Sequence, residues 1–144
     1  MKKTTGELME ILEKNKNIDS YLKANEDELS DCSLTDFLAA LLDEKGVTKA
    51  EVISRSGINT VYAYQIFSGL KKPSRDRLIQ LAFGFGLDIE QTQRLLKIGG
   101  GSALYPRNKR DSIIISAVCN NKSVIECDEM LYDRGEKMIS SDVK

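Results

Sequence analysis

Apolar residues recur along the middle of this chain at the spacing of helical faces. The first clear stripe consists of Leu34, Phe37, Leu38, Leu41 and Leu42, which follow one another in steps of three, one, three and one residues. Ser33 precedes this stripe and Gly46 follows it, so the pattern predicts a helix with a cap at each end. Comparable stripes continue as far as Gly135, and no strand-like alternation competes with them. The chain is therefore predicted to be all-α.

Side chains that favour helix N-caps stand before each later stripe. They are Thr48, Asn59, Ser74, Asp88, Asn108 and Ser123. Their side-chain oxygens can accept the unpaired N–H groups of a first helical turn. Gly57 and Gly69 fall where a turn needs a residue that tolerates positive φ. Residues 33–98 are thus predicted to form five short helices, and residues 99–135 a C-terminal helical pair that is too small to stand alone.

The two ends of the chain are predicted to differ from this middle part. The spacing of Thr4 and Glu7 fits a capping box, so residues 1–32 are predicted to be a helical N-terminal arm. Residues 136–144 are predicted to be a frayed tail. Cys119 and Cys127 fall on predicted apolar faces and are interpreted as reduced core thiols.

The composition restricts the location and the chemistry of the protein. With 144 residues and 41% hydrophobic content, the chain fits one ordinary domain with attached segments. No stretch is apolar enough to cross a bilayer, and the lysine-containing start has no apolar core like that of a signal peptide. We therefore expect a cytoplasmic protein without a membrane partner.

The chain contains no histidine, which is the commonest general base and a common metal ligand. It also lacks a Cys-x-x-Cys pair, a Walker loop and a nucleophile elbow. The sequence therefore predicts no catalytic residue, no metal site and no cofactor, and the protein is not expected to be an enzyme.

The net charge of −1 conceals an uneven distribution along the chain. Residues 45–77 carry seven basic and two acidic side chains, and residues 78–110 carry five basic and two acidic ones. Residues 1–44 and 111–144 are both acidic overall. A basic centre between acidic flanks is typical of a region that contacts nucleic acid, although a solvated surface also accounts for it.

The sequence of residues 34–89 resembles the Cro/C1-type helix-turn-helix family of bacterial and phage repressors. The residues that carry the resemblance are Thr48, Ala50, Glu51, Gly57, Asn59, Ile66, Gly69, Pro73, Ser74, Leu78, Leu81, Ala82 and Leu87. The spacing from Gly57 to Gly69 to Pro73 is that of the family, without insertion. The resemblance implies a five-helix, lambda-repressor-like helix-turn-helix core.

Three departures from the family pattern matter. Ile53 stands where the family usually has a small residue, and Ala63 where it usually has Ile or Val, so together they keep the packed volume. Phe67 replaces a Glu that usually makes a structural polar contact. Helix 60–67, which corresponds to the DNA-reading helix of the family, also lacks arginine, the residue that makes the commonest specific contact to guanine.

The resemblance implies a sequence-specific, DNA-binding transcriptional regulator of the repressor type, with helix 60–67 in the major groove of double-stranded DNA. The residues expected nearest the bases are Thr60, Val61, Tyr62 and Gln65. The residues expected at phosphates are Lys49, Asn59, Tyr64, Lys71, Lys72 and Arg75. Because one such module binds weakly, we expect a homodimer that forms through the C-terminal helices or the arm.

A second hypothesis belongs to a different functional class. The aromatic and apolar face of helix 60–67 also fits a degenerate helix-turn-helix that serves as a protein–protein interaction module. The salt dependence of binding separates the two hypotheses. Affinity that comes from phosphate contacts falls steeply as the salt concentration rises, while the affinity of an apolar protein interface does not.

Overall fold

The computed structural model describes residues 33–141, and the predicted arm of residues 1–32 lies outside the described residues. Within this range the fold is helical and has no strand, which confirms the all-α prediction. The helices are α3 (Leu34–Lys45), α4 (Lys49–Ser56), α5 (Thr60–Ser68), α6 (Arg75–Phe85), α7 (Ile89–Ile98), α8 (Lys109–Cys119) and α9 (Val124–Asp133). None of these helices is long and apolar enough to cross a membrane.

The helices begin where the capping residues predict. The N-caps are Ser33, Thr48, Asn59, Ser74, Asp88, Asn108 and Ser123, and each side chain accepts a hydrogen bond from the backbone N–H three residues later. Thr48 also forms a full capping box, because the Glu51 carboxylate accepts from the Thr48 backbone N–H at 3.1 Å. Short-range hydrogen bonds of this kind satisfy the donors that an isolated first turn leaves unpaired.

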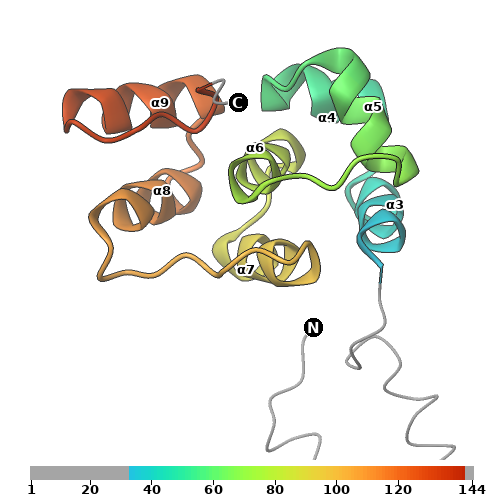
Figure 1. The fold of residues 1–144 in the computed structure, drawn as a ribbon, viewed down its shortest axis with the longest axis horizontal. Helices are drawn as coiled ribbons and strands as arrows, with labels where there is room; N and C mark the ends of the chain where they lie inside the picture. The colour runs from blue at the N-terminus through green and yellow to red at the C-terminus, as the bar shows by residue number, and fades with distance from the viewer. Residues whose placement is uncertain (1–32, 142–144) are drawn as a thin grey trace, which may run out of the picture. The chain divides into compact units, whose positions relative to one another are not determined.

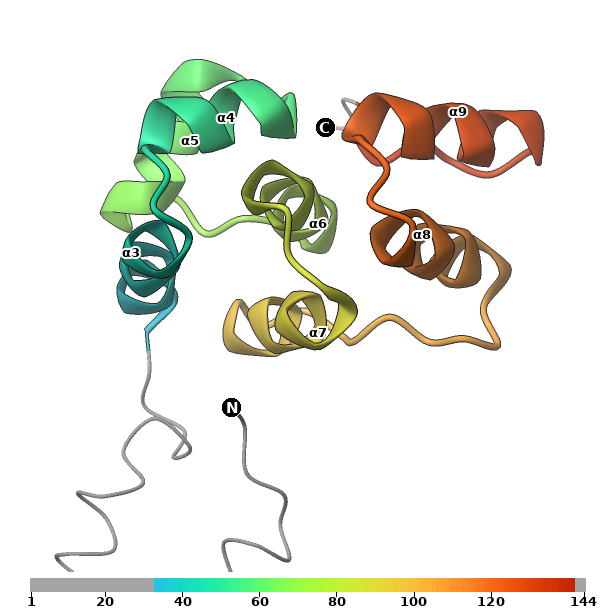
Figure 2. The ribbon, with the colours of Figure 1, turned by 180° about the vertical axis from the view of Figure 1, so that it is seen from behind.

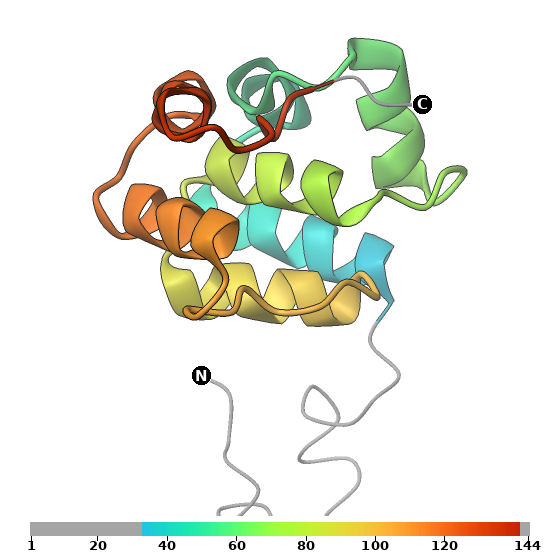
Figure 3. The same cartoon turned by 60° about the vertical axis from the view of Figure 1, so that its left-hand side comes forward.

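Helix α6 lies in the middle of the arrangement in Figure 1, between α4 and α7. Its axis, like those of α3 and α7, is seen nearly end-on in Figure 1 and from the side in Figure 3. Helix α4 approaches α6 closely at Gly84, where an added Cβ atom would lie 2.5 Å from the backbone oxygen of Val52. The α4–α6 contact therefore requires the absence of a side chain at Gly84.

The two residues of the expected volume exchange both lie in the core. Ile53 on α4 and Ala63 on α5 are both buried, at 4% and 0% exposure. Phe67 is also buried, and its ring centroid lies 6.2 Å from that of Phe85 on α6. An aromatic side chain at this position therefore adds to the packing between α5 and α6.

The C-terminal pair α8 and α9 belongs to the same compact unit as α3–α7. Figure 2 shows the connection from α7 to α8 from behind. Two hydrogen bonds to the backbone of Leu104 hold this connection. The Gln93 side chain accepts from the Leu104 backbone N–H at 2.6 Å and donates to the Leu104 carbonyl at 2.9 Å. Leu104 itself is buried, so the glycine-rich stretch before it leads into an anchored loop.

Two sequence expectations about the C-terminal region are wrong. Cys119 is exposed, because it is the last residue of α8 and lies beyond that helix's buried stripe, whereas Cys127 is fully buried as expected. The tail is not frayed over residues 136–141: Ile139 has 0% exposure, and the Asp128 carboxylate accepts from its backbone N–H at 2.6 Å. Burial of Ile139 and these backbone hydrogen bonds hold the segment against the helices.

Candidate nucleic-acid interface

The candidate site consists of α5 and the residues that flank it. Asn59 begins the helix: its side-chain oxygen accepts from the Tyr62 backbone N–H at 3.1 Å. The first turn of α5 contains no acidic residue. The partial positive charge of this helix N-terminus is therefore not offset by a carboxylate within its own first turn.

The four residues expected nearest the bases differ in exposure. Thr60 and Val61 are exposed, with Val61 at 67%, while Tyr62 and Gln65 are half-buried. Helical spacing places Val61 and Gln65 on one face with Tyr64, which is 44% exposed. Tyr62 is thus less exposed than Tyr64, the other tyrosine of this helix.

Three lysines among the expected phosphate contacts are exposed: Lys49, Lys71 and Lys72. Lys49 is the first residue of α4, and its Nζ lies 5.8 Å from the centroid of the Phe67 ring on α5. The backbone N–H of Lys71 donates to the Gln65 carbonyl at 3.2 Å, which ties the loop to the end of α5. The three lysines thus lie in the segments that precede and follow α5, Lys49 at the start of α4 and Lys71 and Lys72 in the loop after α5.

Glu51 reduces the positive potential beside Lys49. Hydrogen bonds from the backbone and then the side chain of Thr48 hold the pKa of the Glu51 carboxyl below its usual range. The carboxylate is therefore ionised at neutral pH, two residues from Lys49. It also lies 3.6 Å from the Arg55 guanidinium, in an exposed pair that is screened by water.

Arg75, another of the expected phosphate contacts, is bound by a carboxylate and two backbone carbonyls. Its guanidinium donates to both carboxylate oxygens of Asp111, at 3.0 and 2.7 Å. It also donates to the carbonyls of Ser102 and Ala103, at 2.9 and 3.0 Å. A phosphate would have to displace a two-pronged carboxylate from this side chain, so Arg75 is removed from the set of candidate DNA contacts.

Leu70 is a surface residue that the sequence reasoning did not single out. It is 70% exposed and follows Gly69 directly, beside Lys71. Together with Val61 and Tyr64 it adds large apolar area to the α5 side of the molecule. A leucine in a turn gives no periodic signal, so helical pattern alone does not mark it.

No group of three or more Cys, Asp or Glu side chains within residues 33–141 is placed to hold a metal ion. Comparison with known proteins does not add a function to this site. No protein-family model matches the sequence, no curated protein is similar to it, and no solved structure matches the fold.

Proposed function

We propose that this protein is a sequence-specific, DNA-binding transcriptional regulator of the repressor type, which places α5 in the major groove. The observation that carries the proposal is the set of exposed lysines, Lys49, Lys71 and Lys72, around a helix that exposes Thr60 and Val61 at its start. Such a surface combines backbone-positioning charges with side chains that can reach base edges. In this proposal α3–α7 form the lambda-repressor-like core that the sequence resembles.

The residues of α5 have separate roles in this proposal. Gln65 can make the two-pronged amide contact with adenine, and Thr60 can donate one hydrogen bond. Val61 offers methyl groups to thymine. The hydroxyl of Tyr64 and the three lysines bind phosphates. Asn59 uses its side-chain oxygen to cap α5, and its amide N–H groups remain donors for a neighbouring phosphate.

The proposed regulator binds as a homodimer, because a single module of this kind covers little DNA surface. Helix α9 offers a candidate dimer surface, since Ile125 and Tyr132 are each 72% exposed. They are seven residues apart and so lie on the same side of the helix. A two-fold dimer would present two α5 helices to a two-fold DNA site.

The proposal is tested by fluorescence-anisotropy titration of labelled random duplex DNA across a salt series. The wild-type protein is expected to lose affinity steeply as salt rises. The double variant Lys71→Ala/Lys72→Ala is expected to reduce the salt slope by about two units, because each lost phosphate contact changes it by about 0.9. Lys97→Ala/Lys122→Ala is the matched control: it removes the same charge from exposed lysines elsewhere and should preserve the slope.

A second candidate function is a protein-interaction module, and the apolar exposure of Val61, Tyr64 and Leu70 favours it. The same titration separates the two functions. Absence of binding by the wild-type protein at low salt would contradict DNA binding and favour a protein partner for this face. Binding that both lysine variants weaken equally would show only nonspecific charge attraction.

A further inference from the structure

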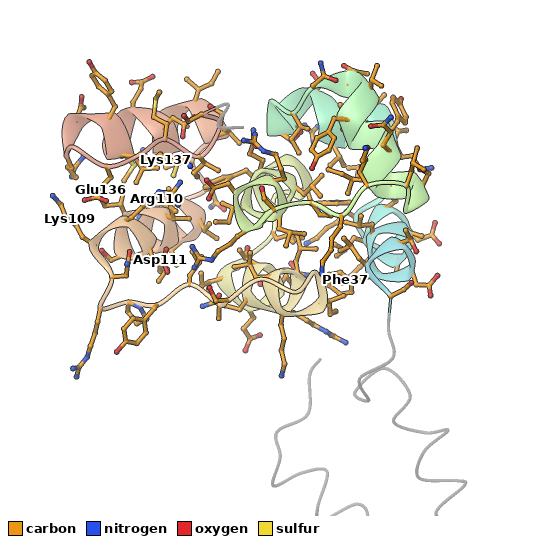
Figure 4. The ribbon with its side chains drawn as sticks, in the orientation of Figure 1. Phe37, Lys109, Arg110, Asp111, Glu136 and Lys137 are labelled. Atoms are coloured by element: carbon orange, nitrogen blue, oxygen red, sulfur yellow. The ribbon has the colours of Figure 1, made fainter. Side chains whose placement is uncertain are left out.

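The residues that follow α9 form an ordered segment, which we call the C-terminal strap (Glu136–Ser141). In Figure 3 this dark-red segment runs from α9 toward α4. The Arg110 side chain donates from Nε to the Lys137 carbonyl at 2.8 Å, and Figure 4 shows Arg110 and Lys137 together where α8 faces α9. The strap therefore begins with its backbone fixed to α8.

Asp128 on α9 fixes the second half of the strap. Its carboxylate is only 7% exposed and accepts from the backbone N–H groups of Ile139 and Ser140, at 2.6 and 3.4 Å. The Ser140 hydroxyl also donates to this carboxylate. A buried carboxylate that accepts hydrogen bonds from several donors is a strong local anchor, because leaving any of these buried polar groups without a partner would cost free energy.

Arg77 on α6 connects the end of the strap to a buried side chain. Its Nη2 donates to the Ser141 carbonyl at 3.0 Å, and its Nη1 donates to Oε1 of Gln80. Gln80 has 0% exposure. From its other end, Nε2 donates to the Ser56 carbonyl at 3.0 Å. A continuous set of hydrogen bonds thus joins the strap to the last residue of α4.

The orientation of the Gln80 amide follows from its two neighbours. The guanidinium of Arg77 only donates and therefore requires the amide oxygen, while the Ser56 carbonyl only accepts and requires the amide nitrogen. One of the two amide orientations satisfies both ends, and the flipped one satisfies neither. Loss of the Arg77 contact would leave the buried Gln80 amide oxygen without this donor, and the amide would then be held from the Ser56 side alone.

Ser56 lies at the start of the turn that leads into α5. Its hydroxyl donates to the Ile53 carbonyl at 2.8 Å and accepts from the Ile58 backbone N–H at 3.2 Å. Gly57 follows with a φ of 73°, and Asn59 then caps α5. The Gln80 contact therefore reaches the backbone that sets where α5 begins.

We propose that the C-terminal strap, acting through Arg77 and Gln80, positions the turn of residues 57–59 and thereby the DNA-binding face of α5. This inference rests on the proposed function for its effect on DNA. Its structural part, the coupling of strap and turn, stands independently. Arg77 and Gln80 are positioning residues: they act on α5 through the turn and do not contact DNA.

Two variants test the coupling from opposite ends. Arg77→Met removes the donors but keeps an aliphatic side chain, and Ser140→Asp places a second carboxylate against Asp128 to release the strap. Both are expected to accelerate amide hydrogen exchange at Ile58, whose N–H donates to the Ser56 hydroxyl within this turn, by about ten-fold, because a buried polar contact is lost. Lys109→Ala is the matched control, since it removes a strap contact (Lys109 to Glu136, 3.7 Å) that is outside the hydrogen-bond route.

DNA titration of the same variants tests whether the coupling of strap and turn affects DNA binding. Both strap variants should weaken DNA binding by about ten-fold with an unchanged salt slope, because no phosphate contact is lost. A slope reduced by about one unit in Arg77→Met would instead make Arg77 a phosphate contact and overturn its positioning role. Arg77→Lys should recover part of the affinity, since one donor is restored.

Three other outcomes would contradict the coupling, its effect on DNA binding, or the proposed function. Unchanged exchange at the turn in both variants, with melting temperatures close to wild type, would overturn the coupling. Faster exchange with unchanged DNA affinity would overturn the effect on binding. If the wild-type protein does not bind DNA, the proposed function fails together with that effect, and the exchange data alone decide whether strap and turn are coupled.

Discussion

Arg75 and Asp111 are 36 residues apart in the sequence, yet their side chains form a two-pronged ion pair with N–O distances of 2.7 and 3.0 Å. The neighbouring residues repeat this pairing with the charges exchanged. Arg110 donates to both carboxylate oxygens of Asp76, at 3.1 and 3.2 Å. Two Arg-Asp dipeptides, one at the start of α6 and one at the start of α8, thus join the C-terminal pair to the rest of the fold.

Removal of the Asp111 carboxylate is expected to destabilise the protein strongly. Asp111→Ala would leave the Arg75 guanidinium, whose side chain is 24% exposed, without its charged partner. Breaking one side of a largely buried ion pair costs about 3 kcal/mol in the free energy of unfolding. Urea unfolding followed by circular dichroism measures this cost, with Asp133→Ala on the exposed surface of α9 as the control. Equal midpoints for the two variants would show that the pair contributes no net stability.

The same carboxylate makes stability depend on pH. Burial raises the pKa of Asp111, but hydrogen bonds from Arg75 and the Tyr105 backbone outweigh this effect, so the pKa lies below its usual range. A carboxyl whose pKa is lower in the folded state contributes stability at neutral pH, which is lost as the pH falls below about 4. As the pH is lowered from 5 to below about 4, the unfolding free energy of the wild-type protein should therefore fall by more than that of Asp111→Asn. Parallel losses in urea titrations across this range would contradict the assignment.

The close contact between α4 and α6 predicts that one added methyl group at Gly84 lowers the free energy of unfolding strongly. Gly84→Ala would place a Cβ atom 2.5 Å from the Val52 carbonyl oxygen, so the two helices must move apart. Although alanine favours a helix, the overpacking should give a net loss of about 2 kcal/mol. At Gly101 an added Cβ would meet its nearest neighbours at 3.5 Å, an ordinary contact, and Gly101→Ala should leave the unfolding midpoint almost unchanged. A neutral Gly84→Ala variant would mean that this crossing is loosely packed.

Local features of the fold were predictable because their causes are local. An N-cap such as Ser33 acts on a backbone N–H three residues away, so its effect can be read from a short stretch of sequence. The exposed start of α5 follows from the same kind of pattern, with Thr60 and Val61 directly after the Asn59 cap. The all-α class and the helix starts within residues 33–141 depend on such signals.

The features that were missed depend on distant parts of the chain. In the sequence, Arg75 is one more basic residue after Lys71 and Lys72, and only the folded chain brings Asp111 to it. The tail lacks a helical period, so its anchoring by Asp128 gives no signal before the fold is known. The repeated Arg-Asp dipeptides were a visible signal, but one sequence does not say which arginine pairs with which aspartate.

The proposed homodimer predicts that the exposed side of α9 controls oligomeric state. Tyr132→Ser and Ile125→Ser each remove most of a large apolar side chain that is 72% exposed. If α9 forms the two-fold interface, both variants should shift the protein toward monomer in sedimentation velocity across a concentration series, because apolar area buried between copies is lost. Tyr105→Ser is the control, since Tyr105 is 58% exposed in the loop before α8 and lies outside that surface. A wild-type dimer that both α9 variants leave intact would place the interface elsewhere, and a wild-type protein that stays monomeric at every concentration would contradict the dimer itself.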